Sequence, residues 1–321
     1  MRRPGTREGR AWRLGLLTMV VVLGLQLFGA ACAGAIRIPG NNLFPRKLVT
    51  AIFQRAQAQA ARPDSPVSLS LFTNAPVVSV TASDKTRGQW DVNTAVGSIR
   101  ARFVIHATNA YASHLVPSLA AGWHAIVPTR GQVVAYQPAQ GGNPHWTTGW
   151  GGPDTYHFQR PGGECVILGG FREREPAEEF GNADDSAVSA RVGAGLRGYL
   201  PVAFPKWFAP QAGGIEGDVQ LEWTGVMAYR KSGVPLVGHV FVDGVEQVGQ
   251  FISAGYTGHG MPRCQPCGSA VGLMVVDELK GKRSEVPEWL PGHYESKAGG
   301  SDKPRDGREK SGWFGGWCAV M

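Results

Sequence analysis

The sequence predicts an α/β (α+β) fold in which an open sheet is interrupted by a mainly antiparallel region. Near the C-terminus, the strand-like run 248–254 leads through a glycine-rich turn into a helical pattern of apolar residues over 269–279. An earlier β-branched run, 103–105, ends in the small and polar residues 107–109. Between these points, from about 123 to 235, short apolar runs separated by turn residues indicate antiparallel strands.

The first predicted element is a helix over residues 43–61, with Pro45 in its first turn. Its apolar face is expected to contain Leu48, Ile52 and Ala56. Residues 67–80 predict two short strands, or one strand that breaks at 74–76. A hairpin should follow, formed by 90–96 and 99–105 and turning at Gly97.

The antiparallel region is expected to carry the face that meets a substrate. Its predicted elements are strands at 126–127, 132–137, 156–160 and 165–170 and a helix at 184–200. Strands at 220–229, 236–240 and 247–254 should then return the chain to the first sheet. After residue 290 the sequence becomes polar and glycine-rich, which predicts a disordered tail over 291–321.

The glycine-rich turn over residues 255–263 is the most informative motif. Its three glycines permit tight backbone turns, and Pro262 suits the first turn of a helix. Free N–H groups and the positive end of the helix dipole would favour an anion or a polarised ring oxygen here. A plain strand-to-helix turn is the alternative interpretation.

Four segments stand in a characteristic order: 103–111, 128–132, 222–227 and 255–262. This series resembles the FAD-dependent oxidoreductases of the D-amino-acid oxidase type, and the similarity runs from about 33 to 290. The resemblance implies part of a Rossmann-like FAD-binding domain with an inserted antiparallel substrate domain. It also implies hydride transfer to flavin from a small amine or amino acid.

The resemblance implies FAD contacts from a dispersed set of residues: Val77, Ala107, Thr108, Asn109, Arg130, Gly131, Gly225, Gly258, His259, Gly260 and Met261. Val77 would face the adenine, and residues 107–109 would pass under the phosphates. These assignments are expectations carried over position by position.

The flavin ring of the cofactor would contact two sets of these residues, Arg130 with Gly131 and the turn over 258–260. Arg130 beside Gly131 resembles the loop at the ring edge, although a solvated surface arginine is the alternative. Backbone N–H groups of Gly258, His259 and Gly260 would stabilise the negative charge of the reduced ring. His259 itself is expected to act as a polar cap.

No catalytic acid or base can be named from the sequence. Tyr156, His157, Tyr229 and Arg230 are candidates for the substrate pocket, and each is equally compatible with an ordinary position in the sheet. His106 is expected to be buried and hydrogen-bonded.

One departure from the family pattern is evident. No Gly-x-Gly-x-x-Gly turn stands between a strand and a helix before residue 33. A formal match at 193–198 follows a polar, helix-like run, so a helix end is expected there. Two functions therefore stay open: a FAD-dependent oxidoreductase, or a non-catalytic, membrane-tethered remnant of the fold without bound FAD.

Residues 1–32 read as a signal peptide or membrane anchor, because the eighteen residues 14–31 carry no charge and follow an arginine-rich start. A gene-model artefact is the alternative. The first interpretation predicts a membrane or secretory location. The last four residues, beginning at Cys318, match a prenylation signal, which would instead suit a cytoplasmic protein.

Composition excludes several classes. The net charge of +7 is concentrated at the arginine-rich start, and no basic block interleaved with aromatics follows, so nucleic acid is not an expected partner. Five irregularly spaced cysteines predict neither a disulfide framework nor a metal site. Cys264 and Cys267 are expected to pack the first turn of the last helix, and a secreted redox protein is a minor third hypothesis.

Overall fold

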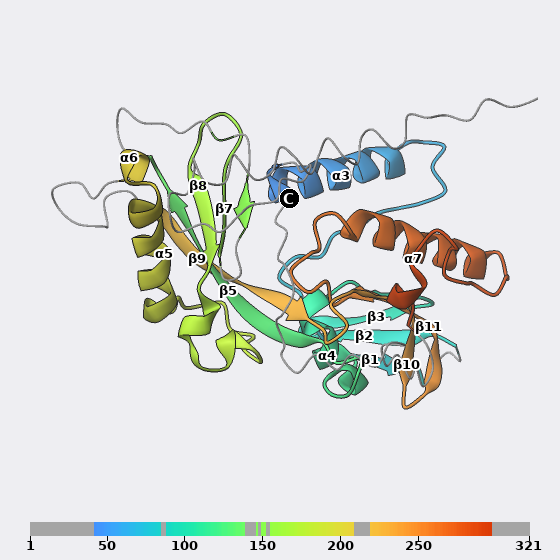
Figure 1. Ribbon diagram of the computed structural model, residues 1–321. Coiled ribbons are helices and arrows are strands. Elements are labelled where there is room, and N and C mark those ends of the chain that lie inside the picture. The colour runs from blue at the N-terminus through green and yellow to red at the C-terminus, as the bar shows by residue number, and fades with distance from the viewer. Residues whose placement is uncertain are drawn as a thin grey trace, which may run out of the picture.

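The computed structural model describes residues 42–84, 88–138, 146, 149–151, 155–208 and 219–296. These residues form three sheets with helices packed against two of them (Figure 1). The predicted α/β class is therefore confirmed. The long strands β5 (Val127–Tyr136) and β9 (Val219–Tyr229) extend from the antiparallel region toward the sheet that contains β4 (Val104–His106), so their ends bring the two regions together (Figure 1).

The first helix, α3 (Pro45–Ala60), matches the predicted span and buries none of its residues. A three-stranded antiparallel sheet follows, with strands β1 (Val77–Ala82), β2 (Trp90–Thr94) and β3 (Gly97–Ala101). Residues 67–76 belong to no strand, and Asn74 has a left-handed φ of 56°, so only one of the two strands expected over 67–80 forms.

The second sheet has the order β10-β11-β4. Strand β4 (Val104–His106) pairs parallel with β11 (Val245–Ala254), and β11 pairs antiparallel with β10 (Leu236–Val242). Helix α7 (Cys264–Leu279) covers one face through buried residues such as Met274. The short helices η3 (Asn109–Tyr111), α4 (Ala112–Leu115) and η4 (Pro117–Leu119) cover the other.

The third sheet is the predicted antiparallel region, with the order β6-β7-β8-β5-β9. Its strands are β6 (Trp150–Gly151), β7 (Thr155–Gln159), β8 (Val166–Gly170), β5 (Val127–Tyr136) and β9 (Val219–Tyr229). Helices α5 (Ala190–Ala203) and α6 (Pro205–Phe208) pack on it through an apolar cluster that includes Leu168, Leu196 and Phe208. Three 3-10 turns complete the elements: η5 (Arg172–Arg174), η6 (Pro176–Glu179) and η8 (Gly292–Tyr294).

Four predicted boundaries were wrong. The chain predicted as one strand over 99–105 divides between β3 and β4, which lie in different sheets. Strand β5 is continuous where two strands were expected. Residues 184–189 form a loop before α5, because polar contacts hold them against β5 and β9. Residues 291–296, predicted as the start of a disordered tail, belong to the fold, since Ser296 donates to the His239 carbonyl of β10; the rest of the predicted tail lies outside the described residues.

Strand β4 lies at the end of its sheet, and β11 is its partner among the described residues. Ile105 of β4 is 47% exposed, and α3 exposes Leu48, Val49 and Ile52. Within the described residues, we call β4, with its half-exposed Ile105, the open edge. Within the described stretches, no helix combines the length and apolar character needed to cross a bilayer. The predicted anchor over 14–31 and Cys318 lie outside these stretches.

Candidate functional site

Asn109 joins the ends of the two parallel strands. It follows β4 with a φ of 44°, a left-handed conformation that Asn tolerates better than most residues. Its side-chain oxygen accepts hydrogen bonds from the backbone N–H groups of Gly255 at 3.0 Å and Tyr256 at 3.4 Å. The predicted segments 107–109 and 258–261 are therefore parts of one corner at the carboxyl ends of β4 and β11, where open sheets bind ligands.

The turn after β11 also packs against the end of β9. Thr257 donates its N–H to the Ala228 carbonyl at 2.7 Å, and its hydroxyl accepts the N–H of Arg230 at 3.2 Å. Gly258 has a φ of 73°, and a Cβ placed on it would lie 3.2 Å from the Tyr229 hydroxyl. Glycine is required here because both the conformation and the close approach disfavour a side chain.

The three N–H groups expected to meet a flavin ring are not equivalent. His259 donates its N–H to the Tyr256 carbonyl at 3.0 Å, and its Nδ1 lies 2.6 Å from the Thr257 carbonyl. The His259 N–H is therefore occupied, and the His259 side chain bonds the turn itself and does not cap α7, whose N-cap residue is Arg263. Among the described residues, the N–H groups of Gly258 and Gly260 have no hydrogen-bond acceptor.

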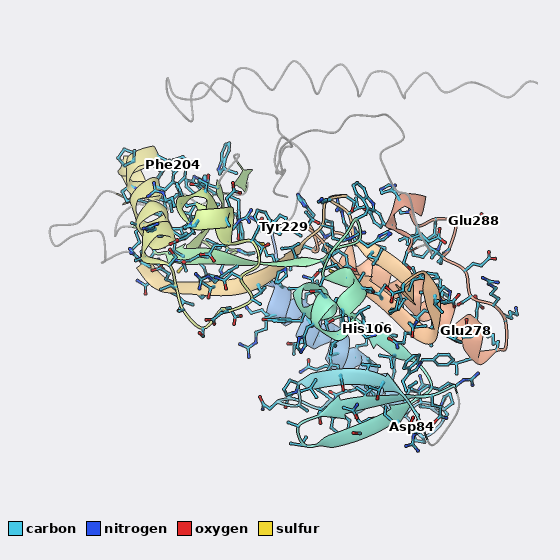
Figure 2. All side chains as sticks on the ribbon, turned by 90° about the horizontal axis from the view of Figure 1, so that it is seen from below. Asp84, His106, Phe204, Tyr229, Glu278 and Glu288 are labelled. Carbon is cyan, nitrogen blue, oxygen red and sulfur yellow. The ribbon has the colours of Figure 1, made fainter. Side chains whose placement is uncertain are left out.

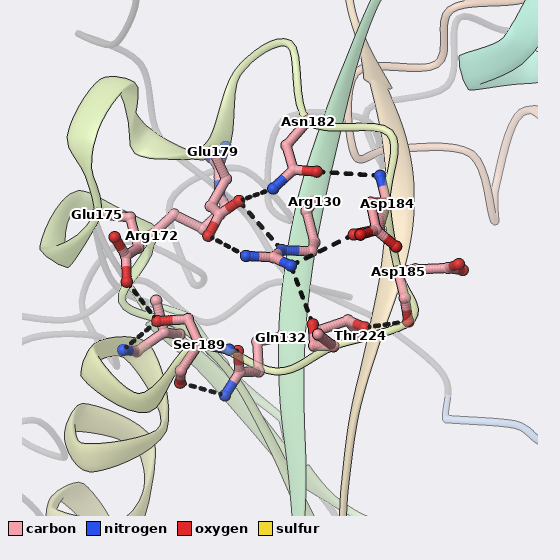
Figure 3. A network of polar contacts seen from close by, with 12 residues as sticks. Arg130, Gln132, Arg172, Glu175, Glu179, Asn182, Asp184, Asp185, Ser189 and Thr224 are labelled. Atoms are coloured by element: carbon pink, nitrogen blue, oxygen red, sulfur yellow. Dashed lines mark hydrogen bonds and ion pairs between the residues drawn. The ribbon is translucent and has the colours of Figure 1, made fainter.

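Arg130 lies in the middle of β5, opposite Val226 of β9, and not in a loop as expected. Its guanidinium makes two bonds to the Glu179 carboxylate, at 3.1 and 2.9 Å, and further bonds to the carbonyls of Asp184 and Ala187 (Figure 3). Its side chain is 14% exposed, so the surface-arginine interpretation is wrong. The bond to Glu179 raises the pKa of Arg130.

Glu179 belongs to a loop, residues 171–189, that we call the strap. Ala177, Glu178 and Glu179 have φ values of 54°, 50° and 64°, three consecutive non-glycine residues in the left-handed region. Such conformations cost roughly 1–2 kcal/mol per residue. The Arg130 ion pair and an Asn182 bond to Glu179 at 2.7 Å offset that cost (Figure 3). Strained backbone held in this way is concentrated at functional sites.

A cluster of Arg172, Phe180 and Tyr229 connects the strap to the glycine-rich turn. Arg172 lies over the rings of Tyr229 and Phe180, at 4.9 and 5.4 Å from their centroids, and donates to the Tyr229 hydroxyl at 3.3 Å. The two rings meet edge to face at 5.4 Å. Tyr229, the last residue of β9, lies where the antiparallel region that contains Phe204 approaches the β10-β11-β4 sheet that contains His106 (Figure 2).

The other predicted cofactor residues are spread around this corner. Ala107 and Thr108 lie next to Asn109 and are exposed, as is Met261 after the glycine turn. Gly131 and Gly225 face each other across β5 and β9, beside Arg130. Val77 begins β1 in the three-stranded sheet, and no described contact joins it to Asn109.

Of the four candidates for the substrate pocket, Tyr229 and Arg230 lie at the corner, whereas Tyr156 and His157 do not. Tyr156 packs its ring on Gly169 of the neighbouring strand. His157 is 2% exposed among Trp146, Tyr199 and Phe204. Burial lowers the pKa of His157 to about 4. It is a residue of the apolar core.

The expectation for His106 is confirmed: it is buried and bonds Gln250 through Nε2 at 2.7 Å, and burial lowers its pKa. Of the two cysteines expected to pack the first turn of α7, Cys267 is buried, whereas Cys264 is exposed. Desolvation raises the pKa of both thiols, which is opposite to the direction found in reactive redox cysteines. No group of side chains in the described residues is arranged to hold a metal ion.

The Gly-x-Gly-x-x-Gly match at 193–198 lies inside α5 and not at a helix end. A Cβ on Gly193 would lie 2.5 Å from a Glu222 oxygen, and one on Gly195 would lie 2.8 Å from Arg174. These glycines permit close packing of the helix, so they do not form a phosphate-binding turn.

The sequence did not indicate Arg172 or Glu179 as site residues, because nothing local to either residue indicates its distant partner.

No protein-family model matches the chain, and no curated protein sequence matches it. Among solved structures, it is similar to glycine oxidase from Geobacillus kaustophilus, with a TM-score of 0.59 and 20% identity over 84% of this chain and 64% of the oxidase. It is also similar to iminodiacetate oxidase from Chelativorans sp. BNC1, with a TM-score of 0.54 and 18% identity over 78% of this chain and 58% of that one.

A third similar structure is NikD, an amino acid oxidase essential for nikkomycin biosynthesis, with a TM-score of 0.51 and 18% identity over 73% of this chain and 56% of NikD. The chain therefore has the fold of the amine and amino-acid oxidases. The fold expected from the resemblance to the D-amino-acid oxidase type is confirmed. The chain spans less than two thirds of the length of each of these three structures.

Proposed function

We propose that the protein is a FAD-dependent oxidoreductase that oxidises a small amine or amino acid. The observation that carries this proposal is the corner in which Asn109 bonds the turn after β11. At that corner, segments 107–109 and 258–261 follow the carboxyl ends of the parallel neighbours β4 and β11. The antiparallel region lies beside them, because Tyr229 at the end of β9 approaches Gly258. A cofactor between the two regions would meet a substrate brought by the antiparallel sheet.

The residues at the corner fit the ring end of FAD. Gly258 and Gly260 are positions where a Cβ would crowd Tyr229 and Cys264, so only glycine leaves space for a close planar group. Their N–H groups, near the start of α7, would donate to a ring oxygen and stabilise negative charge there. When bound, FAD would supply the acceptor for the hydride that leaves the substrate carbon.

The described residues fit the phosphate end of FAD less well than its ring end. Apart from the 255–260 turn between β11 and α7, the described residues contain no glycine-rich turn from a strand into a helix that could hold the pyrophosphate, and the formal Gly-x-Gly-x-x-Gly match lies inside α5. This observation favours the second candidate function, a non-catalytic form of the fold that binds no FAD. Membrane tethering through residues 14–31 belongs to that candidate. A secretory location, or a cytoplasmic one with prenylation at Cys318, is likewise a proposal that a reporter fusion of residues 1–40 would test.

The two candidates make opposite predictions for flavin binding. We expect the purified full chain, incubated with excess FAD and then gel-filtered, to retain flavin absorption. Gly258→Val should abolish that retention, because its side chain would enter the ring space and adopt an unfavourable φ. Tyr256→Phe is the matched control, since it changes the same turn but leaves the ring space open. A colourless wild-type protein would support the non-catalytic form.

A further inference from the structure

A pocket of about 250 Å³ lies beside β10, where the short helix η4 packs on the β10-β11-β4 sheet. Its walls are mainly apolar side chains from η4, β10 and β11: Leu119, Leu236, Val240, Phe241 and Ile252. Most of these residues are buried members of one core cluster, so packing fixes the shape of the walls. None of the described residues that line this pocket belongs to the corner at Asn109.

Two serines line the pocket next to β10. Ser118 donates its hydroxyl proton to the Phe241 carbonyl at 3.2 Å. Ser296 donates its hydroxyl proton to the His239 carbonyl at 2.6 Å. A hydroxyl has one proton and two lone pairs. Because both protons are used within the protein, each serine oxygen can only accept a hydrogen bond from a ligand.

The two histidines of the pocket add no unbalanced positive charge. His239 lies between the Ser284 carbonyl and the Glu246 carboxylate, each 3.2 Å from one ring nitrogen, so Glu246 balances any charge on the ring. His124 Nδ1 lies 3.2 Å from Arg230 Nη2. Because arginine only donates, His124 Nδ1 is unprotonated and the ring is neutral. Among the described residues, no lysine or arginine lines the pocket.

Asp243 brings a negative charge to the same pocket. It forms, with Gly244, the two-residue turn between β10 and β11, and the two residues have φ values of 50° and 78°. A tight hairpin requires such left-handed conformations, so the turn sets the position of Asp243. Asp243 is exposed and makes no ion pair with another described residue. The pocket therefore combines apolar walls with oxygen acceptors and a carboxylate on its solvent side.

We propose that this pocket binds a small organic cation, in which a protonated nitrogen is attached to an apolar or aromatic body. The body would pack against Leu119, Val240 and Ile252, where the hydrophobic effect favours its burial. The nitrogen would donate to Ser118 and Asp243 on the solvent side, which limits the cost of desolvating its charge. An anion would instead meet a carboxylate and oxygens that only accept. This site is separate from the proposed flavin site and does not depend on it.

Benzamidine and benzamide test this inference, because they share a ring and a similar shape and only benzamidine is a cation. Neither has a hydrogen on the carbon that carries nitrogen, so neither can be oxidised as an amine. Saturation-transfer NMR titrations of the full chain should show tighter binding of benzamidine than of benzamide. Asp243→Asn should weaken benzamidine binding by about threefold, the effect of losing an exposed ion pair, and leave benzamide binding unchanged. Glu288→Gln is the matched control for net charge, because Glu288 is exposed and does not line the pocket.

A second variant, Ser118→Leu, locates the bound ligand. Its larger side chain would fill part of the pocket, so binding of both benzamidine and benzamide should be lost. Retained binding in this variant would place the ligand elsewhere and overturn the inference. If Ser118→Leu fails to fold, Asp243→Asn, which lies in an exposed turn, carries the test.

Three results with the other proteins would also overturn the inference. These are no binding of benzamidine to wild type, equal binding of benzamidine and benzamide to wild type, and equal benzamidine affinities of Asp243→Asn and Glu288→Gln. None of these measurements requires bound FAD. A chain that retains no flavin but binds benzamidine through Asp243 would therefore refute the proposed function alone.

Discussion

Protonation of His157 is expected to destabilise the antiparallel region in mild acid. The imidazole is 2% exposed, and neither of its nitrogens has a hydrogen-bond partner among the described residues. Burial lowers its pKa from 6.5 to about 4. Because the unfolded chain takes up this proton more readily than the folded one, stability is full above about pH 6.5 and falls as the pH approaches 4.

The magnitude follows from the two pKa values. A difference of 2.5 units corresponds to about 3 kcal/mol when both states are protonated, and to about 2.5 kcal/mol at about pH 4.5. His157→Phe removes the proton site and keeps an aromatic ring beside Trp146 and Phe204. The variant should therefore lose less stability than wild type between neutral and acidic pH, by about that amount.

The assay is urea unfolding of both proteins at neutral pH and at about pH 4.5, followed by tryptophan fluorescence. His106 also has a lowered pKa, but it is present in both proteins and cancels in the comparison. His114→Gln is the control, because His114 is exposed. If wild type and His157→Phe lose equal stability on acidification, His157 is not held neutral by the core and the reasoning fails.

Three further predictions test the packing around the site. Arg130→Met should lower the free energy of unfolding in urea by about 3–5 kcal/mol, because it leaves the buried Glu179 carboxylate without its cation. Arg100→Met should lower it by less than about 1 kcal/mol, because the ion pair of Arg100 with Asp91 is exposed. Equal losses in the two variants would show that the Arg130–Glu179 pair does not stabilise the strap. Asn109→Leu should cost about 1–3 kcal/mol by removing the acceptor for two N–H groups, and Asn109→Asp, which keeps an oxygen there, should cost less. Cys264 is exposed, but desolvation raises its pKa, so it should react with a thiol reagent more slowly than a free cysteine peptide at neutral pH and faster as the pH rises. A fast, pH-independent reaction would contradict this.

Local patterns were sufficient to predict several elements. The strand, glycine turn and helix from β11 to α7 were predicted because strand and helix periodicities meet at residues that only turns favour. Helix α3 and most strands of the antiparallel region were found in the same way. The position of residues 107–109 beside this turn followed from the resemblance to a family, because no local signal pairs β4 with β11.

The strap could not be predicted because tertiary contacts override local preference there. Ala177, Glu178 and Glu179 are residues that favour a right-handed helix, yet all three are left-handed. Arg130, which is 49 residues from Glu179 in the chain, holds that conformation. The contacts of Arg130 and Arg172 could not be predicted for the same reason: the partner of each arginine, Glu179 and Tyr229, is distant in the chain.

The open edge has a consequence for how this chain can change over evolutionary time. A segment that pairs with β4 gains its affinity from backbone hydrogen bonds, which any extended sequence can supply. Apolar contact with Ile105 requires only that such a segment be apolar on the facing side. The side chains of any segment that pairs there could therefore change without loss of pairing, whereas Gly255 and Gly258 could not be replaced, because their backbone conformations are ones that other residues rarely adopt.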